Sequence, residues 1–234
     1  SIVDIDFLGA KIYSKFYTYN FPDSEFQVNT NIAKDGIWVI ELPKSAEIEK
    51  EIERQGLIKT IRDEHVSKLD SQMLTFSTDT DAPKTLIELF VQPKLTLKTE
   101  IDSENEENVD DLTNILKDKG NYLLFGTKES GKTVLLNKLT LDCLNSVNGV
   151  NYIPVNVDFA KISNDIISNI RDYLLISKIA TKEALETHQI LLLVDNLKVS
   201  TDFVDLFKIK QITDLVETYP KVKIIATYNV LYGN

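Results

Sequence analysis

A glycine-containing loop between two apolar segments constrains this chain more than any other feature. Tyr122-Leu123-Leu124-Phe125 is long enough for one buried strand, and the segment after the loop is apolar at helical spacing, at Val134, Leu135, Leu136 and Leu139. Between them lies Gly126-Thr127-Lys128-Glu129-Ser130-Gly131-Lys132-Thr133, which fits the pattern G-x-x-x-x-G-K-[ST] at every fixed position. A strand, this loop and a helix in that order form the context in which the pattern holds phosphate groups.

The residue types in the loop match the needs of a phosphate site. Gly126 and Gly131 permit backbone angles and close approaches that a Cβ atom would block. The loop amides and the first turn of the next helix, which includes Val134, form a cradle for an anion. Lys132 would bring its charge to the β- and γ-phosphates, and the Thr133 hydroxyl would ligate Mg²⁺. We therefore predict that residues 126–134 bind ATP together with Mg²⁺. The plainer alternative is a strand-to-helix turn that binds nothing.

A second apolar run ends in an acid. Residues 189–196 read QILLLVDN, which suits a central parallel strand whose carboxyl end meets the ligand at Asp195. This is the Walker B arrangement, in which the aspartate holds Mg²⁺, often through water. We predict Asp195 as a metal ligand and, with Lys132, as a catalytic residue. The alternative is an aspartate that begins an ordinary turn.

Two further apolar runs continue the alternation of strands and helices. Residues 151–157, NYIPVNV, predict a strand that lies beside the strand of the glycine loop. Residues 221–229, KVKIIATYN, predict a later strand with a polar end. P-loop ATPases place a group that senses the γ-phosphate at such an end. Thr227 and Asn229 are the candidates for this role, and Asn229 is predicted to contact the nucleotide.

Charge and composition narrow the class of protein. The net charge is −10, but residues 100–111 alone hold seven acids and no base, whereas residues 112–234 hold 14 basic and 13 acidic residues. The sequence therefore offers no broad basic surface for nucleic acid. No apolar run reaches the length of a membrane span, and the N-terminus lacks the pattern of a secretory signal. The one cysteine, Cys143, cannot form an internal disulfide, which suits a cytoplasmic protein, and it is expected to be a packed side chain.

The chain divides into three regions by pattern. Residues 1–82 combine strand-like runs with a helix that Ser45 can cap, with Gly56 as a candidate break, and they are expected to form a small α+β, β-rich module. Residues 83–111 read as a linker that contains prolines and the acidic run. Residues 112–234 are predicted to form the core of an α/β fold, the parallel sheet of a P-loop NTPase flanked by helices.

The three segments GTKESGKT, LLLVDN and KIIATYN together resemble a STAND-type P-loop ATPase of the NACHT-like kind. The resemblance covers residues 85–234 and implies an ATP-dependent switch in a multidomain protein of signalling or antiviral defence. It implies slow hydrolysis coupled to conformational change or assembly into an oligomer, with fused or associated effector and sensor domains. It also implies that residues 1–82 are the tail of an effector domain and that the ATPase domain continues beyond Asn234.

The sequence departs from the family pattern in ways that keep alternatives open. Such domains carry further acids after the Walker B aspartate, whereas Asn196-Leu197-Lys198-Val199 follow here, so no catalytic base is evident nearby; Asp202 and Asp205 lie further on. A non-hydrolysing P-loop scaffold is therefore one alternative. A GTPase is a second, although no N-K-x-D triplet for guanine is present. A small-molecule kinase is a third, and it would need lid arginines, but Arg171 is the only arginine after the loop.

Overall fold

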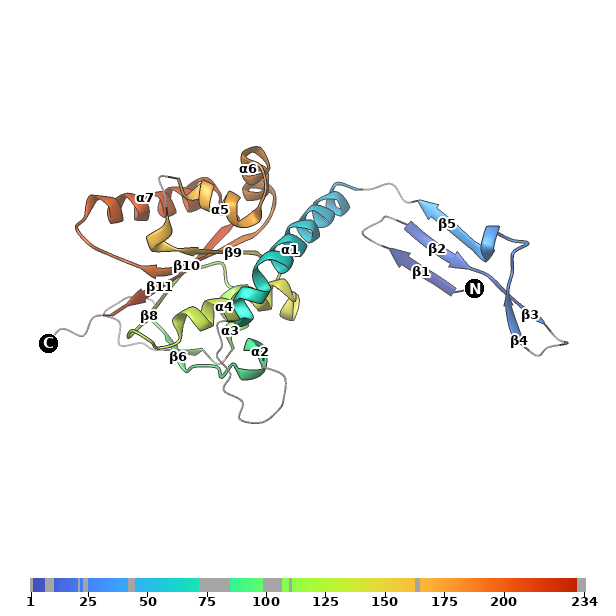
Figure 1. Cartoon of the computed structure of the whole chain (residues 1–234), viewed down its shortest axis with the longest axis horizontal. Helices are drawn as coiled ribbons and strands as arrows, with labels where there is room; N and C mark the ends of the chain where they lie inside the picture. The colour runs from blue at the N-terminus through green and yellow to red at the C-terminus, as the bar shows by residue number, and fades with distance from the viewer. Residues whose placement is uncertain are drawn as a thin grey trace. The chain divides into compact units, whose positions relative to one another are not determined.

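The computed structural model describes residues 2–6, 11–20, 22, 25–41, 45–71, 85–98, 107–109, 111–162 and 165–230 (Figure 1). It divides into two compact units, Ser1–Gly56 and Leu57–Asn234. The predicted boundary at 82 and 83 and most of the acidic run lie outside the described residues, so the predicted three-region division stays a prediction. Among the helices described, none is both long enough and apolar enough to span a membrane.

The first unit is built from short antiparallel strands. β1 (Ile2–Asp6), β2 (Lys11–Lys15) and β5 (Ile37–Glu41) form one sheet in the order β1-β2-β5. β3 (Tyr17–Asn20) and β4 (Glu25–Val28) form a separate hairpin, and the 3₁₀ turn η1 (Lys34–Gly36) precedes β5. This antiparallel module agrees with the β-rich pattern of the N-terminal sequence.

Helix α1 (Ala46–Ser71) begins as predicted but does not break at Gly56. The Ser45 hydroxyl accepts a hydrogen bond from the Ile48 amide (3.3 Å), as expected of a capping residue. A glycine inside a helix costs about 1 kcal/mol relative to alanine. Beyond it, Leu57, Ile58 and Ile61 are buried in the core of the second unit, and this burial outweighs the cost of the glycine. The predicted break at Gly56 is therefore wrong.

The second half of α1 is also held by polar contacts. Arg62 donates to the carbonyl oxygen of Leu144 (2.6 Å). The His65 ring stacks on Tyr173 at a centroid separation of 4.1 Å, and its Nε2 lies 3.0 Å from the Tyr173 carbonyl oxygen. These contacts make Leu57 onward an integral part of the second unit.

The second unit contains a four-stranded parallel sheet covered by helices on both faces. Its strands are β8 (Tyr122–Gly126), β9 (Ile153–Asp158), β10 (Ile190–Leu197) and β11 (Val222–Asn229), in the order β8-β11-β10-β9. Helices α3 (Leu112–Lys117) and α4 (Lys132–Leu144) cover one face, and α5 (Ile166–Leu174), α6 (Lys178–Thr187) and α7 (Phe203–Thr218) cover the other (Figure 1). The coarse form of the predicted α/β fold is confirmed.

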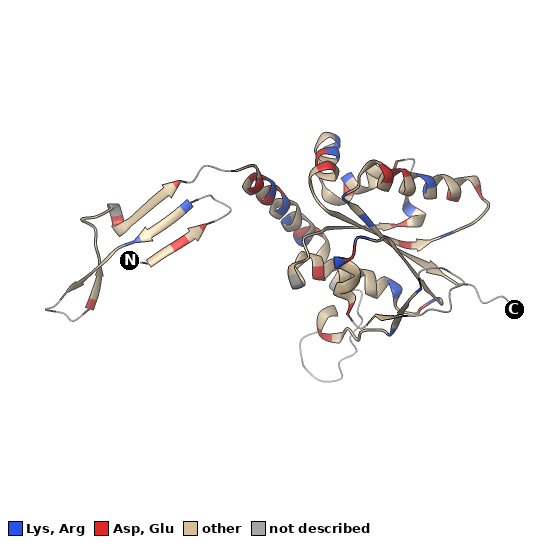
Figure 2. Cartoon of the chain, turned by 180° about the vertical axis from the view of Figure 1, so that it is seen from behind, with Lys and Arg blue, Asp and Glu red and all other residues tan. Residues whose placement is uncertain are grey.

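Short elements complete this unit. α2 (Leu86–Leu89) begins with a capping box formed by Thr85 and Glu88, and β6 (Leu95–Leu97) pairs with β7 (Glu107–Val109). The 3₁₀ turns η2 (Val147–Gly149) and η3 (Phe159–Lys161) flank β9. Basic and acidic residues are interspersed over the helices in the view of Figure 2, in keeping with the near-neutral charge of residues 112–234.

The predicted position of one strand is wrong. β9 was expected beside the strand of the glycine loop, but β11 and β10 separate it from β8. Residues Ile190–Val194 of β10 are fully buried because β10 has a neighbour on each side and helices on both faces. Apolar patterning predicts such burial, but the neighbours of each parallel strand depend on the path of its crossover connection.

The single cysteine is packed as expected. Cys143 is fully buried in the cluster that joins α3 and α4 to the sheet. Burial raises the pKa of its thiol far above the ordinary value, with a smaller contribution from the neighbouring Asp142 carboxylate. The thiol is therefore protonated and structural.

Candidate functional site

The glycine loop leaves β8 and turns into α4 through two residues with left-handed backbone angles. Glu129 has φ 65° and Gly131 has φ 83°, and the Ser130 amide donates to the Thr127 carbonyl oxygen (3.3 Å) between them. At Gly131 the requirement is conformational, since an L side chain rarely adopts this φ. At Gly126 the neighbour is a side chain, because a Cβ atom would lie 2.6 Å from Ser130 Oγ and this hydroxyl would have to move. The local backbone thus explains Gly131, whereas Gly126 is explained by the side chain packed over it.

Lys132 closes the loop on itself. Its Nζ donates to the carbonyl oxygens of Gly126 (3.1 Å) and Thr127 (2.6 Å) and to Ser130 Oγ (3.1 Å). All three acceptors are neutral, so the positive charge of the ammonium group is not cancelled by a carboxylate among these partners. The loop therefore presents a fixed cation at its centre.

The N-terminus of α4 is free to accept an anion. Gly131 is the N-cap residue and provides no side-chain hydrogen bond to the first turn. The amides of the first turn have no intrahelical acceptor, and the helix dipole places partial positive charge there. Together with Lys132, these amides suit a phosphate group, so the geometry of the loop fits the predicted ligand.

Thr133 and Asp195 meet although 62 positions separate them in the sequence. The Thr133 hydroxyl donates to Asp195 Oδ2 (2.7 Å). The other carboxylate oxygen, Oδ1, accepts from the Thr227 hydroxyl (2.6 Å) and from the amide of Asn196 (3.0 Å). The hydroxyl and carboxylate oxygens predicted to hold Mg²⁺ are therefore adjacent, and oxygen atoms are the ligands that this ion prefers.

The parallel sheet explains how these groups come together. Leu193 and Asp195 alternate onto one face of β10, and Ile225 and Thr227 alternate onto the same face of β11. Leu193 and Ile225 pack against α4, so the polar residues at the ends of the two strands face the start of α4. Because β11 is the neighbour of β10 on the side of β8, Thr227 lies beside Asp195 and contacts the carboxylate oxygen that Thr133 does not.

Asn196 follows the acid with a left-handed backbone (φ 57°), where the pairing of β10 with β11 shifts register. This turn aims its amide at both Asp195 Oδ1 and Thr227 Oγ1 (2.9 Å). The apolar pattern of β10 did not predict the turn. Asparagine is enriched among non-glycine residues with positive φ, which is the signal that was available.

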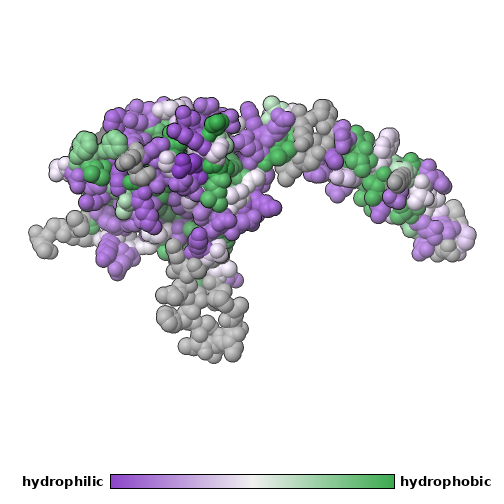
Figure 3. Space-filling view, turned by 45° about the horizontal axis from the view of Figure 1, so that its top comes forward, coloured by the Kyte–Doolittle hydropathy of each residue, from purple (hydrophilic) through white to green (hydrophobic). Residues whose placement is uncertain are grey.

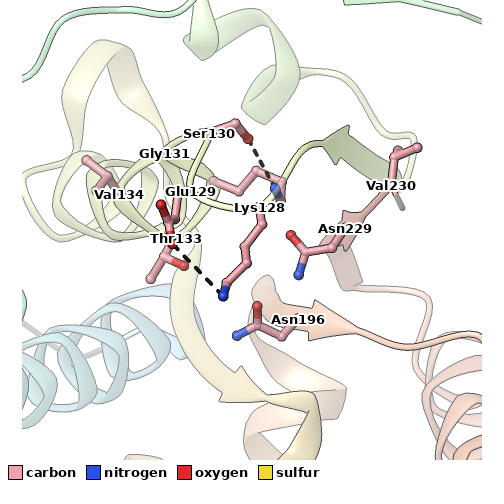
Figure 4. Close-up of a pocket in the computed structure, with 10 residues that line it drawn as sticks. Lys128, Glu129, Ser130, Gly131, Thr133, Val134, Asn196, Asn229 and Val230 are labelled. Carbon is pink, nitrogen blue, oxygen red and sulfur yellow. Dashed lines mark hydrogen bonds and ion pairs between the residues drawn. The ribbon is translucent and has the colours of Figure 1, made fainter. Parts of the chain in front are cut away.

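A pocket of about 490 Å³ opens at this edge of the sheet (Figure 4). Asn196 and Asn229 lie on the side opposite Val134 in this view. The lining comprises Lys128, Glu129, Ser130, Gly131, Lys132, Thr133, Val134, Asn196, Asn229 and Val230. Asn229 lines the pocket, and its predicted contact with the nucleotide stays a prediction; Asn196 and Val230 are additions to the predicted set. Gly126, Thr127 and Asp195 do not line the pocket, but they are hydrogen-bond partners of Lys132 and Thr133, which do.

Other candidate residues have structural partners instead. Asp202 caps α7 by accepting from the Val204 amide (2.9 Å). Asp205 accepts from Ser200 Oγ (2.6 Å) and pairs with Lys198 (3.1 Å). Neither aspartate lines the pocket. Among the described residues, no group of three or more histidine, cysteine or acidic side chains is arranged to hold a metal ion.

Thr227→Val is expected to destabilise the protein by about 1–2 kcal/mol, because Asp195 loses one of its donors in a buried setting. The matched control is Thr213→Val, whose hydroxyl only donates to the Ile209 carbonyl oxygen on the exposed face of α7 and should change stability by less than about 0.5 kcal/mol. Urea unfolding measures both. Equal effects at the two positions would show that Thr227 does not support Asp195.

No protein-family model matches this chain, and comparison with curated proteins finds no significant relative.

Proposed function

We propose that this chain is an ATP-binding, Mg²⁺-dependent switch domain of the STAND type, with slow ATP hydrolysis coupled to conformational change or assembly. The observation that carries the proposal is the 2.7 Å hydrogen bond from Thr133 to Asp195, which joins the glycine loop to the end of β10 at the uncapped start of α4. A strand-to-helix turn that binds nothing needs no such link. The P-loop motif and its flanking elements support the same assignment.

Each residue has a role in this proposal. Lys132 and the first-turn amides of α4 hold the phosphates, and Thr133 and Asp195 hold the metal ion, Asp195 directly or through water. Mg²⁺, when bound, neutralises charge on the β- and γ-phosphates. Thr227 and the Asn196 amide fix the orientation of the Asp195 carboxylate. Asn229 contributes a polar side chain at the pocket wall.

The contacts of Asp195 also offer a route for the switch. Asp195 is bonded to α4 through Thr133 and to β11 through Thr227, and its own strand leads to α7. Mg²⁺ and the Thr133 hydroxyl proton compete for the same carboxylate oxygen. Binding of the metal nucleotide therefore changes the bond between α4 and β10, at a carboxylate that is also bonded to β11, and a nucleotide-dependent switch requires a change of this kind.

A non-hydrolysing P-loop scaffold is the second candidate function. It is favoured by Asn196, which stands directly after Asp195, and by the structural partners of Asp202 and Asp205. Both candidate functions use the same nucleotide site, and they differ in whether bound ATP is hydrolysed and released repeatedly. Multiple-turnover release of phosphate from ATP distinguishes them.

Nucleotide choice provides the direct test of the proposed function. We expect ATP to displace a fluorescent ATP analogue at least about tenfold better than GTP, and EDTA to weaken ATP binding by about tenfold because Thr133 and Asp195 then lack their ion. Competition titrations with and without Mg²⁺ measure both effects. Equal or tighter binding of GTP would favour the GTPase alternative, and no displacement at all would overturn the proposal.

A further inference from the structure

Asp158, at the end of β9, is an acid at the same edge of the sheet that has no role in the site described above. Its register partner on β10 is Asp195, in a parallel pair that also matches Asn156 with Leu193. Residues in register point to the same side of a sheet, and alternate residues of one strand share a face. Neighbouring strands lie about 4.8 Å apart, so the Asp158 side chain begins directly beside that of Asp195.

The contacts of α4 locate Asp158 relative to the glycine loop. Asn156 Nδ2 donates to Thr140 Oγ1 on α4 (2.9 Å). About two turns nearer the start of the same helix face, Thr133 donates to Asp195 (2.7 Å). Asp158 follows Asn156 on the α4 side of β9, in the direction of the helix N-terminus. It therefore lies toward the end of α4 at which the phosphates are proposed to bind.

One carboxylate oxygen of Asp158 is available for a further partner. Oδ1 accepts from the Ala160 amide in η3 (3.1 Å), which fixes the direction of the carboxylate. Among the described residues, Oδ2 has one partner, the Lys161 ammonium group at 3.9 Å, and that lysine is 81% exposed. An exposed ion pair of this length is weak. Oδ2 can therefore bind a water molecule in place of the lysine.

Asp158 differs in this respect from the other aspartates near the site. Both oxygens of Asp195 are bonded within the fold, and Asp202 and Asp205 are held by groups at the start of α7. The Asp158 side chain is 35% exposed, and the surface of the second unit is largely hydrophilic in the view of Figure 3. Water therefore reaches a carboxylate oxygen that lies beside the proposed metal ligand.

We propose that Asp158 is the general base of ATP hydrolysis, an inference that rests on the proposed function. Hydrolysis is assisted by a group that orients the attacking water and takes its proton. Asn196, which directly follows Asp195, carries an amide instead of a carboxylate. The neighbouring strand β9 supplies the missing carboxylate at the level of Asp195.

The reaction is a displacement at the γ-phosphorus. The water oxygen bonds to the γ-phosphorus while the bond from that phosphorus to the β,γ-bridging oxygen breaks, and the electron pair of the broken bond stays on ADP. One water proton moves to Asp158 Oδ2, and the products are ADP and inorganic phosphate. The proton then passes to solvent, to which Asp158 is partly exposed.

Asp158→Asn separates the catalytic role from the structural one. Asparagine keeps an oxygen for the Ala160 amide, so the urea midpoint of unfolding should not change. We expect the affinity for MgATP to change by less than about threefold in calorimetry, and multiple-turnover phosphate release to fall by at least about 100-fold. Asp158→Ser also keeps a capping oxygen and should show the same loss of phosphate release, so it provides a second test if the asparagine variant does not fold.

Asp165→Asn is the matched control. Asp165 caps α5 by accepting from the Ile167 amide (3.0 Å), as Asp158 caps η3. Asparagine caps a helix about as well as aspartate, so this variant should bind MgATP and release phosphate like the unmodified protein.

Binding and turnover are measured separately, so the two proposals fail separately. If the unmodified protein binds no MgATP, the proposed function is wrong and this inference falls with it. If the unmodified protein binds MgATP but releases no phosphate, or if Asp158→Asn releases phosphate at the unmodified rate, Asp158 is not the base although the nucleotide site stands. A loss of MgATP affinity in Asp158→Asn that matches its loss of turnover would make Asp158 part of the binding site and would also overturn the inference.

Discussion

Replacing Lys132 with alanine is expected to weaken binding of MgATP by at least about 100-fold, a loss of about 2.7 kcal/mol. Lys132 is the one ammonium group held at the centre of the loop, by Gly126, Thr127 and Ser130. Its contacts to phosphate would be charge-assisted hydrogen bonds, which are stronger than neutral ones. Isothermal titration calorimetry with MgATP measures the change.

Lys128 offers a matched control in the same loop. It also lines the pocket, but its side chain is 88% exposed and its ion pair with Glu129 spans 4.0 Å. An exposed ion pair of this kind contributes little. Lys128→Ala should therefore reduce affinity by less than about threefold, since its predicted contribution comes from the backbone amide. Unchanged affinity in Lys132→Ala, with the fold intact by circular dichroism, would remove the assignment of the phosphate site.

The glycine loop was predictable because each residue type has a local reason. Gly131 adopts a left-handed φ, Gly126 has Ser130 Oγ within Cβ reach, and Lys132 returns to its own loop. The meeting of Thr133 with Asp195 was predictable as well, because the carboxyl ends of parallel strands lie at one edge of the sheet. Sequence pattern is informative where the determinants are local or follow from strand direction.

The order of the strands in the sheet could not be predicted from local sequence patterns. Thr227 contacts Asp195 only because β11 lies between β8 and β10, and β9 sits at the far edge for the same reason. The apolar runs of β9 and β11 look alike in the sequence, and the crossover connections decide their neighbours. Thr227 was expected to sense phosphate, and the structure gives it a bond to Asp195; Asn229 is the one that lines the pocket.

Gly56 shows a second reason why a local sequence pattern can give a wrong prediction. A glycine in a polar stretch indicates a helix end, but Leu57, Ile58 and Ile61 on its far side are buried by contacts with distant residues. Burial of a side chain of this size contributes about 1.5–3 kcal/mol, which exceeds the roughly 1 kcal/mol that the glycine costs. Tertiary packing therefore overrides the local signal.

Asp195→Asn is expected to remove the Mg²⁺-dependent part of ATP binding while leaving the fold intact. An asparagine keeps an oxygen that can accept from Thr227 and from the Asn196 amide, and its NH₂ group can donate to the Thr133 hydroxyl oxygen. The change in unfolding free energy should therefore stay below about 1 kcal/mol. The lost negative charge should weaken binding of MgATP by roughly tenfold or more and abolish any multiple-turnover release of phosphate.

Repeating the titration without Mg²⁺ distinguishes a loss of metal binding at Asp195 from a loss of structural support for the loop. In EDTA, Asp195→Asn should bind ATP at least as tightly as the unmodified protein, because the carboxylate then has no ion to hold and only repels the phosphates. Asp202→Asn is the control, since asparagine caps a helix about as well as aspartate and Asp202 only caps α7. An equal loss of affinity with and without Mg²⁺ would mean that Asp195 only supports the loop through Thr133. Phosphate release by the unmodified protein that persists in Asp195→Asn would place the catalytic group elsewhere, whereas its absence from both would favour the non-hydrolysing scaffold.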